Sequence, residues 1–290
     1  MKLGVFVNPR KPDVVEAFAR VRKAFESRGW TVIVDEEGAE VLGVPGVKEF
    51  WVGADLIVSL GGDGTFLETI RRMNGCPAPV AGVNIGHLGF LTACQDEEVE
   101  SLAESVTQGR HQVIERSMLC VRMIEEGGAE HECFAINEVV LMRGETGRMA
   151  SLEARVDGEL LNAYRSDGLI VATPTGSTAY SLAAGGPLVG PTAKVMVMTP
   201  ICPHTLSGRP LVIADDSVIE LTPCASEPEP ILFTVDGRDI LRVHPESVVR
   251  VSKASEPLQV VRMPEHSFYE TLRKKLSWSG GARVDPKTLS

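Results

Sequence analysis

A strand–turn–helix unit near residue 60 constrains this chain more than any other segment. An apolar run at residues 55–60 leads into Gly61-Gly62-Asp63-Gly64-Thr65, and an amphipathic stretch follows at residues 66–71. Glycines let the backbone approach a phosphorylated ligand closely, and the N–H groups that open the next helix favour its negative charge. The Asp63 carboxylate would repel phosphate, so its presence needs a cause. Three explanations are possible: the carboxylate binds a divalent cation, it holds or deprotonates a hydroxyl group, or it caps the helix. The first two indicate phosphoryl transfer.

The first third of the chain alternates between strand and helix patterns. Its predicted strands are residues 3–7, 31–34, 56–60 and 79–83. Between Val14 and Phe25 apolar residues recur every three or four positions, which predicts a helix with one buried face. This alternation predicts an open parallel sheet covered by helices, with ligands bound beyond the carboxyl ends of the strands. Asp63 is expected at such an end.

From residue 113 onward the pattern changes to many short strands separated by Gly, Pro and Asp turns. Residues 113–123, 133–142 and 152–156 are strand-like, and Asp157-Gly158 has the composition of a hairpin turn. Residues 177–184, which glycines flank, are predicted to form a helix. We therefore expect an α/β domain with an open parallel sheet at residues 1–112 and a β-rich, antiparallel, sandwich-like domain at residues 113–263. A helical segment at 264–290 is expected to pack back on the first domain.

Charge and composition exclude several classes of partner. The 290 residues include 29 basic and 39 acidic side chains, a formal charge of −10, which argues against nucleic acid and anionic membranes. No run approaches the roughly 18 apolar residues of a membrane span, and the apolar start is too short for a signal peptide. The expected location is cytoplasmic. The 6 cysteines are scattered without a Cys-x-x-Cys pair, so free thiols are expected rather than disulfides or a zinc site.

Seven motifs follow one another along nearly the whole chain. They are Gly61-Gly62-Asp63-Gly64-Thr65, Gly86-His87-Leu88-Gly89-Phe90-Leu91-Thr92, Asn137-Glu138, Ser166-Asp167-Gly168-Leu169-Ile170 with Thr173-Pro174-Thr175-Gly176-Ser177-Thr178-Ala179-Tyr180, Pro200-Ile201-Cys202-Pro203-His204-Thr205-Leu206, Arg209-Pro210-Leu211 and Val235-Asp236-Gly237-Arg238. In this order they resemble the motifs of the bacterial NAD kinases of the polyphosphate/ATP-NAD kinase family. The glycine–aspartate turn alone also occurs in lipid kinases and phosphofructokinases, whereas the threonine-rich loop after Asp167-Gly168 is more diagnostic.

The resemblance implies transfer of the γ-phosphoryl group of ATP to the 2′-hydroxyl of the adenosine ribose of NAD, which yields NADP. It assigns to Asp63 the role of accepting the proton of that hydroxyl or orienting its oxygen. Because the chain has no Walker loop, Asp63 and the backbone of Gly61, Gly62, Gly64 and Thr65 would cradle the triphosphate. A divalent cation, expected to be Mg²⁺, would be carried on the phosphates of ATP, and no dedicated metal site is expected.

The β-rich domain is the NAD-binding domain by the same resemblance. Glu138 would accept hydrogen bonds from ribose hydroxyls, Asp167 would contact the adenine or amide edge, and Tyr180 would offer a ring for stacking. Arg165 is implied to favour NAD over NADH, and the backbone at Gly237 to reach the substrate of a neighbouring subunit, hence a homodimer or homotetramer. The implied NAD-binding residues are Asn137, Glu138, Arg148, Arg165, Asp167, Thr178, Ala179, Tyr180, Ser181, Leu182, Ala183 and Gly237.

Several alternatives stay open at the level of sequence. A lipid kinase of the same glycine–aspartate group would need an apolar pocket, an NADP 2′-phosphatase would run related chemistry with water, and a non-catalytic module would only bind dinucleotide. His204 is the alternative general base, although a loop histidine is the simpler interpretation. Polyphosphate is an alternative donor to ATP. Asp63 acts either as a base or as an orienting group, because a loose transition state needs little proton removal.

Overall fold

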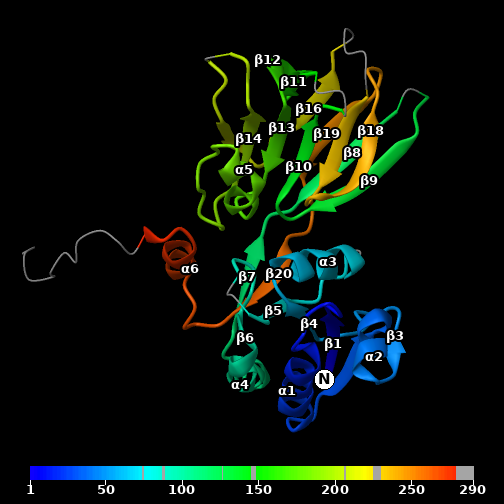
Figure 1. The fold of residues 1–290 in the computed structure, drawn as a ribbon, viewed down its shortest axis with the longest axis vertical. Helices are drawn as coiled ribbons and strands as arrows, with labels where there is room; N and C mark the ends of the chain where they lie inside the picture. Colours follow the sequence, from blue (N-terminus) through cyan, green and yellow to red (C-terminus); the bar gives the residue numbers. More distant parts are fainter. Residues whose placement is uncertain are drawn as a thin grey trace, which may run out of the picture. The chain divides into compact units, whose positions relative to one another are not determined.

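The computed structural model describes residues 1–73, 75–86, 89–125, 127–144, 148–205, 207–224 and 230–278, without the side chains of 239 and 240 (Figure 1). The chain divides into two compact units. Unit 1 comprises residues 1–114 and the chain from residue 259, and unit 2 comprises residues 115–258. The predictions that concern His87, Leu88 and the final dozen residues lie outside the described part.

Unit 1 is built on an eight-stranded sheet in the order β3-β2-β1-β4-β5-β20-β7, with β6 paired to β5. The pairs that join β1, β2, β3, β4, β5, β6 and β20 are parallel, as the sequence predicts. The strands are β1 (Lys2–Val7), β2 (Thr31–Asp35), β3 (Gly46–Val47), β4 (Leu56–Gly61), β5 (Val80–Asn84), β6 (Cys94–Gln95), β7 (Gln112–Arg116) and β20 (Leu258–Arg262).

Helices pack on this sheet through apolar faces. The predicted amphipathic helix is α1, whose Val14, Phe18, Val21 and Phe25 join the buried core formed with the sheet. Helix α2 has no counterpart among the predicted elements; Asp35 caps it by accepting a hydrogen bond from the Gly38 amide at 3.0 Å. The helices are α1 (Val14–Glu26), α2 (Glu36–Leu42), α3 (Asp63–Met73), α4 (Val99–Thr107) and α6 (Phe268–Lys275), and a 3₁₀ turn, Asp96–Glu98, precedes α4.

The strand order reverses between β1 and β4. From β1 the chain moves to β2 and β3 on one side, then returns to β4 and β5 on the other side. At such a switch point the loops that leave the carboxyl ends of the two central strands diverge and leave a crevice where ligands bind. Here those loops begin at Asn8, after β1, and at Gly62, after β4.

Unit 2 is a sandwich of two six-stranded antiparallel sheets, which confirms the predicted fold class. One sheet has the order β15-β14-β13-β10-β17-β18 and the other β12-β11-β16-β19-β8-β9. The strands are β8 (Leu119–Ile124), β9 (Glu130–Ala135), β10 (Glu138–Met142), β11 (Ala150–Val156), β12 (Glu159–Ser166), β13 (Gly168–Ala172), β14 (Val195–Ile201), β15 (Leu211–Ala214), β16 (Ile219–Pro223), β17 (Ile231–Val235), β18 (Arg238–Val243) and β19 (Val248–Lys253).

Two local predictions in unit 2 need correction. The strand-like stretch 133–142 is divided into β9 and β10 by a bend at Ile136 and Asn137. The predicted helix 177–184 is a 3₁₀ turn, Gly176–Thr178, followed by the short helix α5 (Tyr180–Ala183), because Ala179 between them has a non-helical backbone with φ −100° and ψ −129°. The Asp157-Gly158 hairpin between β11 and β12 is confirmed.

Candidate functional site

The Asp63 carboxylate does not cap its own helix. Asp63 is the first residue of α3, but its Oδ2 accepts a hydrogen bond from the Phe90 amide at 2.9 Å, and its Oδ1 accepts one from the Leu91 amide at 3.0 Å. Both donors belong to the segment after β5, next to β4 in the sheet. The carboxylate is therefore held in one orientation at the carboxyl ends of β4 and β5. The observed contacts of the acid thus anchor the Phe90 segment and do not cap α3.

Two glycines are required by close contacts around this carboxylate. A Cβ on Gly89 would lie 2.0 Å from the Asp63 Oδ1, and a Cβ on Gly61 would lie 2.2 Å from the Thr65 Oγ1. The Thr65 hydroxyl accepts a hydrogen bond from the Gly62 amide at 3.4 Å. The hydrogen bond between Gly62 and Thr65 thus closes the glycine turn. The Phe90 segment can approach Asp63 because residue 89 has no side chain.

In unit 2, a bend at Ile136 and Asn137 presents Glu138 at the start of β10. The Asp236 carboxylate accepts hydrogen bonds from three consecutive amides, those of Ile136 at 2.9 Å, Asn137 at 2.8 Å and Glu138 at 3.0 Å. Asp236 lies in the β17–β18 turn with a positive φ of 48°, and Gly237 follows with a φ of 72°. A half-buried side chain 100 residues away therefore fixes the backbone of the Asn137-Glu138 motif.

The threonine-rich loop packs directly on this bend. The Thr173 amide donates to the Asn137 carbonyl at 2.8 Å, and the Thr173 hydroxyl donates to the Ile136 carbonyl. A Cβ on Gly176 would lie 2.0 Å from the Asn137 carbonyl oxygen, so glycine is required there. The predicted residues Thr178, Ala179, Tyr180, Leu182 and Ala183 are all at least partly accessible in this loop and α5. The Ser181 side chain is instead buried and its hydroxyl is 2.8 Å from that of Thr199.

Glu138 is the most perturbed carboxyl group of this region. Its exposure is 5%, and burial, with repulsion from Asp236, raises its pKa to about 8, although the Tyr180 amide donates a hydrogen bond to it. Its Oε2 is buried and has no hydrogen-bond partner within the described residues. A buried acceptor of this kind costs stability until a donor reaches it. A ligand hydroxyl is such a donor.

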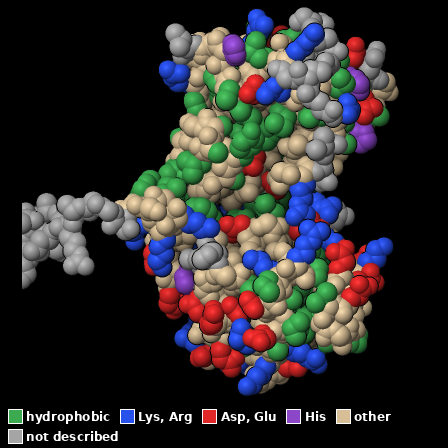
Figure 2. All heavy atoms as spheres, in the orientation of Figure 1, with side chains coloured by type: hydrophobic (Ala, Val, Ile, Leu, Met, Phe, Trp, Pro, Cys, Tyr) green, Lys and Arg blue, Asp and Glu red, His purple; other side chains and the backbone are tan. Residues whose placement is uncertain are grey.

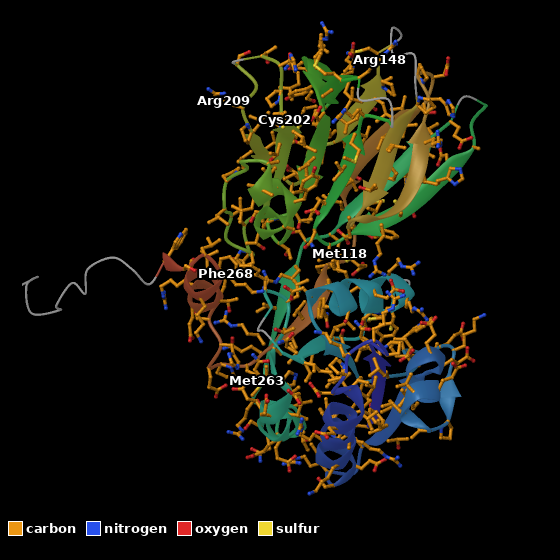
Figure 3. All side chains as sticks on the ribbon, in the orientation of Figure 1. Met118, Arg148, Cys202, Arg209, Met263 and Phe268 are labelled. Atoms are coloured by element: carbon orange, nitrogen blue, oxygen red, sulfur yellow. The ribbon has the colours of Figure 1, made fainter. Side chains whose placement is uncertain are left out.

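The predicted residues Arg148, Arg165 and Asp167 form a second group in unit 2. The register pairs Glu138 with Ala172 and Met142 with Gly168, so Asp167 lies one residue beyond the last pair, five residues along from Glu138, or about 17 Å at the usual rise of a strand. The Arg143 Nε is 3.0 Å from the Asp167 Oδ1, and the His204 amide donates to the Arg165 carbonyl at 3.0 Å. In Figure 3, Arg148 and Cys202 lie at the end of the sandwich away from α5.

The described residues contain no cluster of three or more His, Cys, Asp or Glu side chains that would hold a metal ion. Near the glycine turn the available carboxylate is Asp63, which already accepts two amide hydrogen bonds. Each of its oxygens keeps a further lone pair for a hydroxyl or a cation. In the same part of the chain, no helix is long and apolar enough to cross a membrane.

Sequence reasoning missed three contributors to these sites. Phe268 of α6, which Figure 3 labels, has its ring centre 6.2 Å from that of Phe90, in the segment that holds Asp63. Asn8 donates from its Nδ2 to the Thr65 hydroxyl at 3.2 Å, and Lys11 donates from its Nζ to the Ile85 carbonyl at 3.1 Å. The Asn8-Pro9 pair after a predicted strand is a turn signal that would have indicated a loop at this edge of the sheet.

Comparison with known proteins gives consistent results for both units. Residues 3–111 match the family model of the ATP-NAD kinase N-terminal domain, and residues 136–263 match that of the ATP-NAD kinase C-terminal domain. The NAD kinase of Moorella thermoacetica is 39% identical over 287 residues, covering 98% of this chain and 91% of its own. That of Symbiobacterium thermophilum is 38% identical over 280 residues, covering 95% of this chain and 99% of its own.

Two solved structures share the fold over nearly the whole chain. Yeast NADH kinase complexed with NADH has a TM-score of 0.89 at 26% identity and covers 98% of this chain and 89% of its own. An NAD kinase from Archaeoglobus fulgidus in complex with ATP has a TM-score of 0.75 at 25% identity and covers 96% of this chain and 99% of its own. The similarity extends over both units.

Proposed function

This chain belongs to the ATP-NAD kinase family, and from that membership we propose that it transfers the γ-phosphoryl group of ATP to the 2′-hydroxyl of the adenosine ribose of NAD, forming NADP. We assign the acceptance of the hydroxyl proton and the binding of the donor phosphates to unit 1. Recognition of the dinucleotide is assigned to unit 2. The observation that carries the proposal is the Asp63 carboxylate, fixed by two amides at the carboxyl edge of the sheet.

Asp63 receives the 2′-hydroxyl in this mechanism. A secondary hydroxyl is a weak nucleophile, and its proton becomes acidic as its oxygen bonds to phosphorus. The Phe90 and Leu91 amides leave each Asp63 oxygen a free lone pair, so the carboxylate accepts the hydrogen bond of the hydroxyl and then its proton. Because the amides already fix the carboxylate, little reorganisation is needed when the phosphoryl group transfers.

The donor triphosphate is assigned to the turn formed by Gly61, Gly62, Gly64 and Thr65, where no atom lies within 4 Å of the position that a Cβ on Gly64 would take. A divalent cation bound to the phosphate oxygens of ATP, which we propose to be Mg²⁺, supplies positive charge to the transferring group. Asp63 is the carboxylate of this turn that would face such an ATP complex.

Recognition of the ribose is assigned to Glu138 and the loop that packs on it. Its unpartnered Oε2 is an acceptor that a ribose hydroxyl would satisfy. Because the proton of the 2′-hydroxyl is assigned to Asp63, the hydroxyl assigned to Glu138 is another ribose hydroxyl of the dinucleotide. The ring of Tyr180, which is 39% exposed, is available for stacking.

We propose that the second group, Arg148, Arg165 and Asp167, contacts dinucleotide bound by another copy of this chain. Its distance from Glu138 along β10 favours this assignment over contact with the ribose at Glu138. It agrees with the expected homodimer or homotetramer. The assignments of Asn137, Thr178, Ala179, Leu182, Ala183 and Gly237 to the NAD site, and the cytoplasmic location, are likewise proposals.

The relatives described above are NAD or NADH kinases by name, and they give no support to a lipid kinase, an NADP phosphatase or a non-catalytic module. The deciding experiment incubates the purified protein with NAD and MgATP and measures NADP with an NADP-specific dehydrogenase. Parallel reactions replace ATP with polyphosphate, omit the metal, or start from NADP and follow phosphate release. NADP formation is expected with MgATP; absence of product at micromolar enzyme would refute the kinase assignment.

A further inference from the structure

A rigid turn at the carboxyl end of β1 lies beside the glycine turn. The Lys11 amide donates to the Asn8 carbonyl at 3.1 Å, and the Arg10 amide donates to the Asn8 Oδ1 at 3.0 Å. Pro9 occupies the second position, where its fixed φ suits this kind of turn. The Asn8 amide donates to the Leu60 carbonyl at 3.2 Å, which attaches the turn to the end of β4.

Further contacts join this turn to the segment that carries Asp63. Asn8 donates from its Nδ2 to the Thr65 hydroxyl at 3.2 Å, so one side chain bridges the two turns on either side of the switch point. Lys11 crosses the same edge, and its Nζ lies 3.1 Å from the Ile85 carbonyl. The Ile85 amide in turn donates to the Gly61 carbonyl at 2.8 Å. The Lys11 ammonium is thereby placed beside the glycine turn.

Among the described residues, no carboxylate forms an ion pair with Lys11. An ammonium group has three donors, and the Ile85 carbonyl takes one of them. None of the ion pairs found among the described residues involves Lys11, whereas Arg72, from the end of α3, is paired with Glu37 and Glu68. The chain carries a formal charge of −10, and acidic side chains gather over α1 and α4 of unit 1 (Figure 2). A half-buried cation at the switch point of such a protein attracts an anion locally.

We propose that Lys11 binds the phosphate groups of the donor nucleotide. This inference rests on the proposed function, which brings a triphosphate to the glycine turn. In a P-loop enzyme the phosphate-binding lysine is part of the glycine-rich loop itself. Here it comes from the neighbouring strand, at a position fixed by the Asn8 turn. Lys11 is a point charge with two free donors, which suits the oxygens of a polyphosphate chain.

The test compares Lys11→Met and Lys11→Arg with the control Lys23→Met, whose lysine is exposed on α1 of the same unit. Steady-state kinetics give KM for ATP and for NAD, and inorganic tripolyphosphate is titrated as an inhibitor competing with ATP. Lys11→Met should lower kcat/KM for ATP by about 10- to 100-fold, the loss typical of one hydrogen bond to a charged group. It should weaken tripolyphosphate inhibition in parallel and leave KM for NAD unchanged, and Lys11→Arg should restore part of the loss.

Thermal unfolding of each variant separates binding from folding. If Lys11→Met behaves as Lys23→Met does, or if it lowers Tm and raises both KM values alike, Lys11 does not bind phosphate and the inference is wrong. Direct calorimetric titration with MgATP keeps the result independent of turnover. A wild-type protein that binds MgATP but forms no NADP refutes the proposed function, and the loss of ATP affinity in Lys11→Met still decides the role of Lys11.

Discussion

Asp63 combines an ionisable group with a fully determined orientation. Its two oxygens each accept one backbone amide hydrogen bond, from Phe90 and Leu91. An asparagine in its place has one carbonyl oxygen and one NH₂ group, so one of these amides would face a donor instead of an acceptor. The substitution therefore removes the proton acceptor and disturbs the segment at Phe90, while the dinucleotide contacts assigned to unit 2 are untouched.

We expect Asp63→Asn to lower kcat by about 10²- to 10⁴-fold, the usual contribution of general-base catalysis, with NAD binding retained. Single-turnover kinetics measure the first quantity and calorimetry the second. Asp13→Asn is the matched control, because Asp13 is exposed and its side chain makes no capping hydrogen bond to α1. A variant that keeps more than about a tenth of kcat would show that Asp63 only orients the hydroxyl.

Glu138 makes the stability of the protein depend on pH. Its pKa is about 8 in the folded chain, against 4.5 for an ordinary glutamate, because burial and Asp236 disfavour the charged form. A raised pKa means that the folded state binds the proton more tightly. The resulting stabilisation is complete below about pH 4.5 and is lost as the pH rises through about 8.

Glu138→Gln, which is neutral at every pH, should therefore unfold at a higher Tm than wild type, and the difference should grow between pH 5 and pH 9. At the alkaline end we expect a gain on the order of a few kcal/mol in the free energy of unfolding. Calorimetric melts at both pH values measure it, with the exposed Glu159→Gln on β12 as control. A difference that does not vary with pH would contradict the assignment.

At the scale of elements, the segment after β5 is shaped around Asp63. A Cβ on Gly89 would lie 2.0 Å from the Asp63 Oδ1, so Gly89→Ala must displace the carboxylate or the Phe90 amide. We expect kcat to fall by at least about 10-fold without a change in KM for NAD, since misplacement of a reacting group is costly. Gly190→Ala is the control, because no atom lies within 4 Å of its added Cβ. Equal activity of the two variants would contradict this view of the segment.

Helix α6 contacts the same segment from the other end of the chain. The Phe90 and Phe268 rings are 6.2 Å apart, and the Lys275 ammonium lies 5.7 Å from the centre of the Phe90 ring. Phe268→Ala should remove about 0.5–1.5 kcal/mol of aromatic contact and lower kcat severalfold by loosening the Phe90 amide. Val15→Ala, at a side chain of α1 that is 50% exposed, is the control in the same unit. Hydrogen exchange at Phe90 and Leu91 should rise in the first variant alone.

Elements whose signals are local could be predicted from the sequence. The 3.6-residue period of α1, the strand before Gly61 and the Asp157-Gly158 hairpin all depend on neighbouring residues. Features that depend on distant partners could not. The chain bends at Ile136 because Asp236 binds three amides there, and the helix expected at 177–184 is interrupted at Ala179, where the next amide, that of Tyr180, bonds to Glu138. For the same reason, the sequence indicated that Glu138 binds the dinucleotide, but it did not indicate that the pKa of Glu138 is raised.

At the scale of the whole molecule, oligomer formation can be tested because Asp167 is assigned to the dinucleotide of another copy of the chain. Sedimentation of the active enzyme should show a dimer or a larger assembly. Asp63→Asn and Asp167→Asn chains, each inactive alone, should regain activity when co-expressed, because a mixed dimer contains one site with both residues intact. As the control, the two variants are purified separately and mixed under conditions in which subunits do not exchange. Active monomers, or no recovery in verified mixed dimers, would contradict the assignment of Asp167 to a second copy.

The strand β20 has a consequence for the order in which the protein is made. Val260 pairs with Val80 of β5, and the 144 residues of unit 2, 115–258, separate the two segments of unit 1. During synthesis the whole sandwich of unit 2 emerges from the ribosome before β20, so the sheet that carries Asp63 is still incomplete at that stage. In the nascent chain, the edge of β5 at Val80 therefore has no partner until β20 has been made, whereas β6 pairs farther along β5. Unit 1, whose synthesis starts first, is therefore the unit whose sheet is completed last.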